Sequence, residues 1–301
     1  MHRFNGVYTA LITPFTDIGT VDYQALERIV NEQIESGIDG LVPCGTTGES
    51  PTLSHEEHDR VIAQTIKYAA GRVPVIAGTG SNATTEAIRL SQHAEDSGAD
   101  AVLLVNPYYN KPTQKGLFLH FKAIADSVKI PCILYNIKGR TGVNLETETL
   151  IRLENECSNI VAVKEASGSL DQMKDVIEGT DDDFSVLSGD DNLALDLIKA
   201  GGDGVISVAS NLFPREMVRM VHSAMDGNWD EADRLGGWFR DFFSLCFVET
   251  NPIPIKTAMA HAGWCRESFR LPMCPLESSE HRNALFQCID RMMDDVKEGR
   301  V

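Results

Sequence analysis

Eight short apolar segments typical of buried β-strands alternate along this chain with amphipathic segments of helical period. The expected strands cover residues 7–13, 40–44, 73–78, 101–106, 131–135, 160–165, 184–188 and 204–208. Apolar residues recur at helical spacing between them, for example over residues 23–36, 56–70, 85–97 and 116–127. A (β/α)₈ barrel needs eight such strand–helix units, whereas an open doubly wound sheet rarely uses eight. The sequence therefore predicts an α/β protein with a TIM-barrel fold.

The alternation ends after residue 208. Residues 214–227 supply the eighth helix, and three more helices are expected over residues 229–247, 253–262 and 276–296 with no strand between them. We therefore expect two parts, a (β/α)₈ barrel over residues 1–227 and a C-terminal α-helical domain over residues 228–301. The helical part would pack on the barrel or on a partner subunit.

Charge and cysteine content limit the partners and the compartment. The formal net charge of −17 at pH 7 makes nucleic acid and anionic membranes unfavourable partners, because their phosphates repel such a surface. No apolar run approaches the roughly 18 residues of a membrane-spanning helix, and the N-terminus carries no apolar leader. Of the seven cysteines, several such as Cys44 and Cys132 lie in apolar segments, and none forms a CxxC pair. We therefore expect a reduced protein in the cytoplasm.

One lysine stands at the end of an apolar strand, in the segment Ile-Val-Ala-Val-Lys-Glu-Ala-Ser-Gly at residues 160–168. Because side chains alternate along a strand, Lys164 is expected on the same face as Ala162 and Ile160. Burial disfavours the ammonium form, which lowers the pKa and yields the neutral amine that a nucleophilic lysine needs. The alternative interpretation is an ion-paired or snorkelling lysine at a strand end.

Residues of unusual character, most of them polar, gather at the C-terminal ends of several strands. They are residues 45–50, 106–112, Tyr135, Asn136, residues 140–142, Lys164, residues 188–191, Ile206 and Ser207. Barrel enzymes build their active sites at this end, so the one-sided placement favours a catalytic Lys164.

Each of these residues also has a structural interpretation. Thr46 and Thr47 could cap the next helix, and Tyr135 could be a core tyrosine. We interpret Asp190 and Asp191 as structural residues that favour the first turn of a helix over residues 192–200.

Two motifs suggest cofactors that the rest of the sequence does not support. Residues 78–83 fit G-x-G-x-x-A, but the next strand lacks the acidic residue that would bind a ribose. His55 and His58 are three residues apart, without the H-E-x-x-H pattern or an evident third ligand. We therefore expect neither a metal nor an organic cofactor.

Eight ordered motifs resemble those of the dihydrodipicolinate synthase family, within the Schiff-base pyruvate aldolase superfamily that includes N-acetylneuraminate lyase. They are GTTGES (45–50), PVIAGTGSNAT (74–84), NPYYNKP (106–112), YNIKGRTG (135–142), VKEASG (163–168), LSGDD (187–191), GVISVASN (204–211) and FVETNPIPIK (247–256). The resemblance covers essentially the whole chain.

The resemblance implies condensation of pyruvate with L-aspartate 4-semialdehyde, on the pathway to lysine and diaminopimelate. Lys164 would form an imine with pyruvate. Tyr135 would act as general acid and base, linked through Thr46 to Tyr109, which reaches into the neighbouring subunit's site in this family. The substrate-binding residues that the resemblance implies are Thr47, Arg140, Gly189 and Ile206. Thr46 and Thr47 would hold the pyruvate carboxylate, and Arg140 would bind the carboxylate of the aldehyde.

Two positions depart from the family pattern. Lys138 stands where proline is common, and Asn106 stands where threonine is common. Lys138 adds a cation and loosens the loop that carries Arg140.

The family resemblance also implies an effector site and an assembly. In relatives inhibited by L-lysine, the effector binds at the tight dimer interface, and the matching residues in this sequence are Ser50, Pro51, His55, His58, Asn82, Glu86 and Tyr108. Glu86 would accept the effector's ammonium. The alternative is that His55 and Glu86 are ordinary residues at helix starts. A homotetramer of two tight dimers is expected.

Two other functions remain open from the sequence alone. The first is a different pyruvate-dependent class I aldolase, acting on a 2-keto-3-deoxy sugar acid or on N-acetylneuraminate. Arg140 argues against it, because sugar-acid lyases need residues suited to hydroxyl groups there. The second is a non-catalytic lysine-binding paralogue, which retention of Lys164, Tyr135, Thr46 and Tyr109 together argues against.

Overall fold

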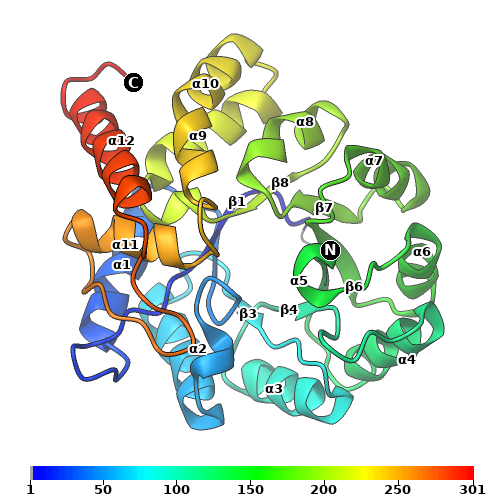
Figure 1. Cartoon of the computed structure of the whole chain (residues 1–301). Coiled ribbons are helices and arrows are strands. Elements are labelled where there is room, and N and C mark those ends of the chain that lie inside the picture. The colour runs from blue at the N-terminus through cyan, green and yellow to red at the C-terminus, as the bar shows by residue number, and fades with distance from the viewer. Residues whose placement is uncertain (1–2) are drawn as a thin grey trace.

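A computed structural model describes residues 3–301 and arranges eight parallel strands in a barrel (Figure 1). The strands are β1 (Gly6–Ala10), β2 (Gly40–Val42), β3 (Ile76–Gly78), β4 (Ala101–Val105), β5 (Cys132–Asn136), β6 (Ile160–Glu165), β7 (Ser185–Ser188) and β8 (Gly204–Ser207). Their order is β2-β1-β8-β7-β6-β5-β4-β3. A parallel bridge between Leu41 and Val75 joins β2 to the chain entering β3 and closes the ring. The predicted (β/α)₈ architecture is confirmed.

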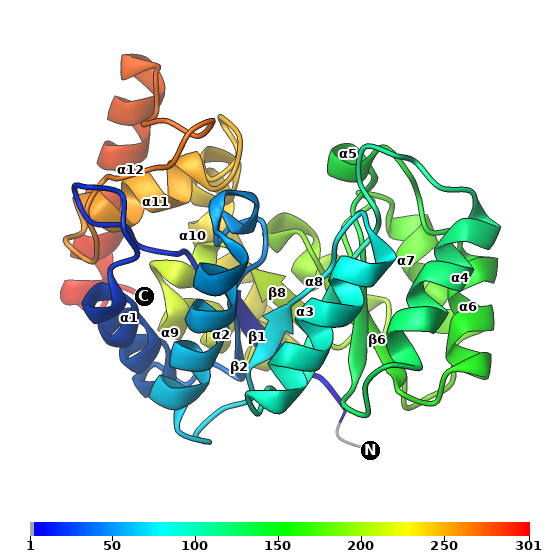
Figure 2. The ribbon, with the colours of Figure 1, turned by 90° about the horizontal axis from the view of Figure 1, so that it is seen from below.

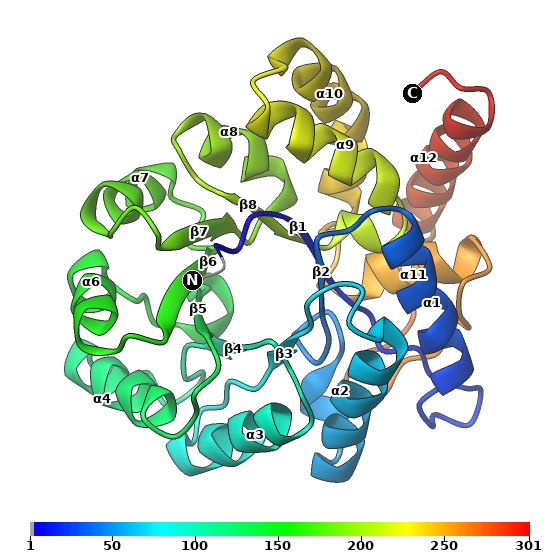
Figure 3. The same ribbon diagram turned by 180° about the vertical axis from the view of Figure 1, so that it is seen from behind.

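Helices surround the barrel, as the side view in Figure 2 shows. They are α1 (Tyr23–Glu35), α2 (His55–Ala69), α3 (Thr84–Asp96), α4 (Gln114–Ala125), α6 (Thr147–Glu156), α7 (Leu170–Gly179), α8 (Ala194–Lys199) and α9 (Pro214–Met225). A short helix, α5 (Lys138–Thr141), comes between β5 and α6 and lies above the C-terminal ends of the strands. At the opposite end, seen in Figure 3, the chain enters β1, and the Phe4 amide donates to Ser185 Oγ at the start of β7 (2.9 Å).

Three further helices follow the barrel: α10 (Trp229–Leu245), α11 (Ile253–His261) and α12 (Ser279–Lys297). Helix α10 packs against α9 and α12, while α11 packs against the 3₁₀ turn Ala209–Asn211 that follows β8. The predicted helical extension is therefore present, and the domain division at residue 227 stays a prediction. No helix within residues 3–301 combines the length and apolar character needed to cross a membrane.

The apolar side chains form two layers. The inner layer fills the barrel and includes Tyr8, Leu103, Tyr135, Ala162 and Ile206, while the outer layer lies between the strands and the helices. Burying both faces of every strand explains why the strand segments read as continuous apolar runs.

The prediction that Ile160 shares a face with Ala162 and Lys164 is wrong. Ile160 packs in the outer layer, whereas Ala162 packs in the inner one. The register between β5 and β6 shifts at this point, because Cys132 pairs with Ile160 but Ile133 pairs with Ala162. The extra residue interrupts the alternation of side chains, as a β-bulge does.

The first predicted strand also ends earlier than expected. Beyond Ala10 the Ile12 amide donates to Asn211 Oδ1 (3.1 Å) instead of to a neighbouring strand. Residues 11–13 nevertheless stay buried, which explains their apolar strand-like pattern.

A buried ion pair joins the α-helical extension to the barrel. Lys256 Nζ on α11 lies 2.5 Å from Glu49 Oε1 in the loop after β2, and neither side chain is exposed to solvent. The ammonium also lies over the ring of Phe15, 3.9 Å from its centroid. Burial lowers the pKa of Lys256, and the negative charge of the Glu49 carboxylate partly offsets this decrease.

We expect Lys256→Met to lower the free energy of unfolding by about 3–5 kcal/mol, because it leaves the Glu49 carboxylate buried without its paired cation. The double variant Lys256→Met, Glu49→Met should recover most of that loss. Chemical denaturation measures both, with Lys297→Met as the control because that lysine pairs with Asp294 on the surface. A double variant no more stable than Lys256→Met would contradict this interpretation.

Candidate active site

Lys164 lies inside the barrel at the C-terminal end of β6, with only 5% of its surface exposed. Burial lowers the pKa of its amine to about 8, against the opposing effect of the Asp190 and Asp191 carboxylates. Its Nζ atom lies 4.4 Å from the centroid of the Tyr135 ring. At neutral to mildly alkaline pH a substantial share of such an amine is uncharged and able to attack a carbonyl carbon.

Two adjoining cavities lie at this end of the barrel, and Lys164 lines the smaller one. The smaller, of about 30 Å³, is lined by Lys164, Thr47, Gly189 and Asp190 among others. The larger, of about 410 Å³, extends towards α2 and α3. The residues lining both are Gly45, Thr46, Leu103, Tyr135, Ile137 and Arg140. The larger cavity therefore adjoins the one that holds Lys164, and these six residues form the boundary between them.

Tyr135, whose ring lies next to Lys164, carries a hydroxyl group. Burial raises the pKa of Tyr135 above its ordinary value, and hydrogen bonding with the Thr46 side chain partly offsets this effect. Tyr135 therefore stays protonated in the free site and can donate a proton to a substrate oxygen.

Asn251 ties together two residues at the entrance. Its Nδ2 donates to Thr47 Oγ1 (3.0 Å), and its backbone oxygen accepts from Arg140 Nη2 (2.9 Å). Asn251 has no role among the predicted site residues, although it lies within the motif at residues 247–256. In the sequence, only its place in that motif pointed to Asn251, because the residues that Asn251 contacts are far away along the chain.

Gly189 leaves room for the Lys164 side chain because it has no Cβ atom. A Cβ atom at this position would lie 2.4 Å from the Ala166 Cβ atom and 3.1 Å from the Lys164 Cε atom. Ile206 is fully buried inside the barrel and lines neither cavity.

The two acidic residues after β7 have different environments. The Asp191 carboxylate accepts hydrogen bonds from the Val208 and Ala209 amides (3.1 and 2.9 Å) and so holds the loop after β8. Asp190 lines the Lys164 cavity. Both residues do lie at a helix start, because Asp190 precedes the 3₁₀ turn Asp191–Leu193 that leads into α8, but Asp190 also lines the Lys164 cavity.

Tyr109 does not join the other predicted catalytic residues. Its side chain is 90% exposed, and its φ of +74° is unusual for a bulky residue. Tyr108, in contrast, lines the larger cavity.

The predicted effector residues form a second group at the far side of the larger cavity. Ser50, Pro51, His55, His58, Glu86 and Tyr108 line it, while Asn82 Nδ2 donates to the Tyr108 carbonyl oxygen (3.1 Å). The Glu86 carboxylate accepts from His55 Nε2 (2.7 Å) and from Ser81 Oγ, and these bonds lower the pKa of Glu86.

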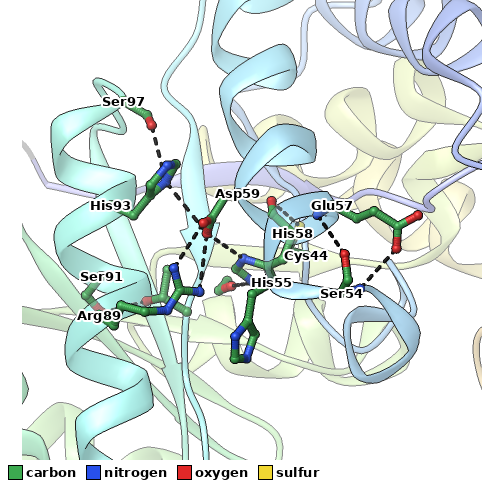
Figure 4. A network of polar contacts seen from close by, with 12 residues as sticks. Cys44, Ser54, His55, Glu57, His58, Asp59, Arg89, Ser91, His93 and Ser97 are labelled. Atoms are coloured by element: carbon green, nitrogen blue, oxygen red, sulfur yellow. Dashed lines mark hydrogen bonds and ion pairs between the residues drawn. The ribbon is translucent and has the colours of Figure 1, made fainter.

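His58 has partners of its own. Its Nε2 atom bonds to the Gly78 carbonyl oxygen (2.9 Å), and burial lowers its pKa. Figure 4 shows His58 beside Asp59, which Arg89 and His93 approach from α3. The two histidines of residues 55–58 thus have separate partners, and the described residues 3–301 contain no group of three or more potential metal ligands.

Comparison with known proteins gives one consistent result. Residues 3–291 match the Dihydrodipicolinate synthetase family. The chain is 54% identical over 273 residues to the 4-hydroxy-tetrahydrodipicolinate synthase of Pelobacter propionicus, an alignment covering 91% of this chain and 93% of that protein.

Two solved structures extend this result to the fold. The 4-hydroxy-tetrahydrodipicolinate synthase from Methylacidiphilum fumariolicum has a TM-score of 0.96 and 46% identity, covering 98% of both chains. The DHDPS from Cyanidioschyzon merolae with lysine bound has a TM-score of 0.94 and 42% identity, covering 97% of this chain and 99% of that one.

We expect Lys164→Met to stabilise the fold at neutral pH. Below about pH 8 the native state holds a charged amine in a buried position, and this cost vanishes as the pH rises to the ordinary lysine pKa. The gain in the free energy of unfolding should be on the order of 3 kcal/mol at about pH 7 and small near pH 10.5. Denaturation at both pH values measures it, with exposed Lys115→Met as control. A gain that does not depend on pH would rule out the buried charge of Lys164 as its cause.

Proposed function

Because the chain belongs to the dihydrodipicolinate synthetase family, we propose that the cavity around Lys164 is where it condenses pyruvate with L-aspartate 4-semialdehyde. Its activity is that of a 4-hydroxy-tetrahydrodipicolinate synthase, a lyase that works through a Schiff base in lysine and diaminopimelate biosynthesis. The observation that carries the site assignment is the buried Lys164 amine, with a pKa of about 8, at the C-terminal end of β6.

Lys164 supplies the nucleophile. Its neutral amine attacks the ketone carbon of pyruvate, and loss of water leaves an imine. Removal of a methyl proton then gives an enamine, whose carbon attacks the aldehyde of the second substrate. Attack of the substrate amine on the imine carbon closes the ring and releases Lys164.

Tyr135 moves the protons of these steps. Its raised pKa keeps the phenol protonated, so that it can protonate the departing hydroxyl group as the imine forms. The Thr46 hydroxyl both donates and accepts, and so can pass this proton onwards. Thr47, held by Asn251, would bind the pyruvate carboxylate together with Thr46.

Gly189 and Ile206 would line the pyruvate site in different ways. Gly189 would keep the wall next to Lys164 free of a side chain. Ile206 would act from within the barrel, through its backbone at the end of β8.

Arg140 would bind the carboxylate of L-aspartate 4-semialdehyde, because Arg140 lines both cavities and a guanidinium suits a carboxylate. A carboxylate-binding arginine at this position distinguishes the proposed enzyme from a sugar-acid lyase.

A panel of substrates tests the proposed role of Arg140. We expect product from pyruvate with L-aspartate 4-semialdehyde and no cleavage of N-acetylneuraminate or a 2-keto-3-deoxy sugar acid. Arg140→Ala should raise the KM of the aldehyde roughly tenfold to a hundredfold, with little change for pyruvate. Lys138→Ala is the matched control, since it removes a neighbouring exposed cation. Equal effects of the two substitutions would contradict the role of Arg140.

Tyr109 would complete the neighbouring subunit's site, which requires at least a dimer, and we propose a homotetramer of two such dimers. The support is its position, since the side chain projects into solvent from a strained backbone conformation.

Mixing two inactive variants tests whether Tyr109 enters the neighbouring subunit's site. In a dimer of Lys164→Ala with Tyr109→Phe, one site would hold an intact lysine and an intact tyrosine from its neighbour. Random reassociation of equal amounts should therefore restore about a quarter of the wild-type sites. No recovery above that of the separate Tyr109→Phe variant would place Tyr109 in its own subunit's site.

L-lysine would bind where the larger cavity meets α2 and α3. Its ammonium would meet Glu86, and its remaining polar groups would meet His55, Asn82 and Tyr108. A relative from Cyanidioschyzon merolae has a structure with lysine bound. Calorimetry should detect binding at millimolar L-lysine, which Glu86→Gln should weaken while leaving condensation intact. Failure of the unmodified protein to bind would remove the effector proposal.

We propose the cytoplasm as the compartment. All seven cysteines are free thiols, and five of them are buried as apolar packing residues, which supports a reducing environment.

A further inference from the structure

The Lys164 cavity contains one side chain of negative charge whose role remains open. Asp190 lines this cavity together with Arg140, and no other acidic residue lines it in the part of the chain that the structure describes. The hydrogen bonds of Asp190 to Ser188 come from its backbone, so its carboxylate, whose charge acts on Lys164, has no protein donor among residues 3–301. Arg140 instead donates to the Asn251 backbone.

A partly buried carboxylate in this position needs a cation. Burial raises the pKa of Asp190, and the positive charge of Lys164 opposes that shift. Lys164 serves as the partner only while it carries a charge. In the enamine form its nitrogen is neutral, so Asp190 faces the second substrate without a counter-ion.

The second substrate of the proposed function brings the missing cation. It carries an aldehyde, a carboxylate and an ammonium group. The enamine takes the aldehyde, and Arg140 takes the carboxylate, which leaves the ammonium to be recognised. Glu86, the acidic residue lining the larger cavity, is already bonded to His55 and Ser81.

We propose that the Asp190 carboxylate binds the ammonium group of the aldehyde substrate and thereby selects an α-amino aldehyde. This inference rests on the proposed function, since it requires L-aspartate 4-semialdehyde to reach Lys164. Asp190 and Arg140 then act as a pair of opposite charges that fixes the orientation of the substrate. A charge-assisted hydrogen bond of this kind is stronger and more directional than a neutral one.

The competing interpretation makes Asp190 only a counter-ion for Lys164. In that case its loss alters the pyruvate step and leaves the choice of aldehyde unchanged. Two aldehydes that differ only in the amino group separate these interpretations. They are L-aspartate 4-semialdehyde and succinate semialdehyde.

The experiment compares Asp190→Asn with the unmodified protein on both aldehydes, following product by mass spectrometry because only the amino aldehyde can cyclise. We expect the KM of L-aspartate 4-semialdehyde to rise roughly tenfold to a hundredfold. The KM of succinate semialdehyde should change less than about threefold, and borohydride should still trap pyruvate. Asp190→Glu should restore part of the preference because it keeps the charge.

Asp196→Asn is the matched control, since it removes the same charge from an exposed position on α8. Equal losses on both aldehydes, no loss on either, or loss of pyruvate trapping in Asp190→Asn would overturn the proposal. An unmodified protein that traps pyruvate but does not condense it with L-aspartate 4-semialdehyde would overturn the proposed function as well, so the two failures are distinguishable.

Discussion

Burial of the Lys164 amine is the constraint on which the site depends. Water solvates an ammonium far better than the barrel interior does, so the fold holds this lysine at a cost in stability and gains an amine that loses its proton near pH 8. The nearby Asp190 and Asp191 carboxylates limit the shift and keep the pKa of Lys164 near 8 instead of lower. The site therefore balances desolvation against negative charge, and both come from the C-terminal ends of β6 and β7.

The second requirement is that the loops around Lys164 hold their positions. The C-terminal helices provide this, although the chemistry lies in the barrel. The buried Glu49–Lys256 pair fixes the loop after β2, and Asn251 joins Thr47 to Arg140. The segment that leads into α11 is consequently part of the active site. Removing it would free both Thr47 and Arg140.

Much of this was predictable from the sequence, for physical reasons. Apolar runs at regular spacing predicted the barrel, and strand β6 has the bounds expected for residues 160–165. Lys164, Tyr135 and Arg140 could be placed at one end because parallel strands all end there. The family resemblance supplied their individual roles. What escaped prediction depends on contacts between distant residues, as with Asn251 and Thr47, or on a local irregularity, as with Ile160. The position of Asp190 in the cavity wall could not be predicted either, since acidic residues near a helix start have a sufficient local explanation.

The most direct measurement is borohydride reduction of the protein in the presence of pyruvate, followed by mass spectrometry of the intact chain and of its peptides. Reduction would convert an imine at Lys164 into a stable secondary amine that carries the pyruvate carbons. We predict a single such adduct, on the peptide containing Lys164, and none in a folded Lys164→Ala variant. An adduct on another lysine, or an equal adduct in the variant, would contradict the assignment of Lys164 as the nucleophile.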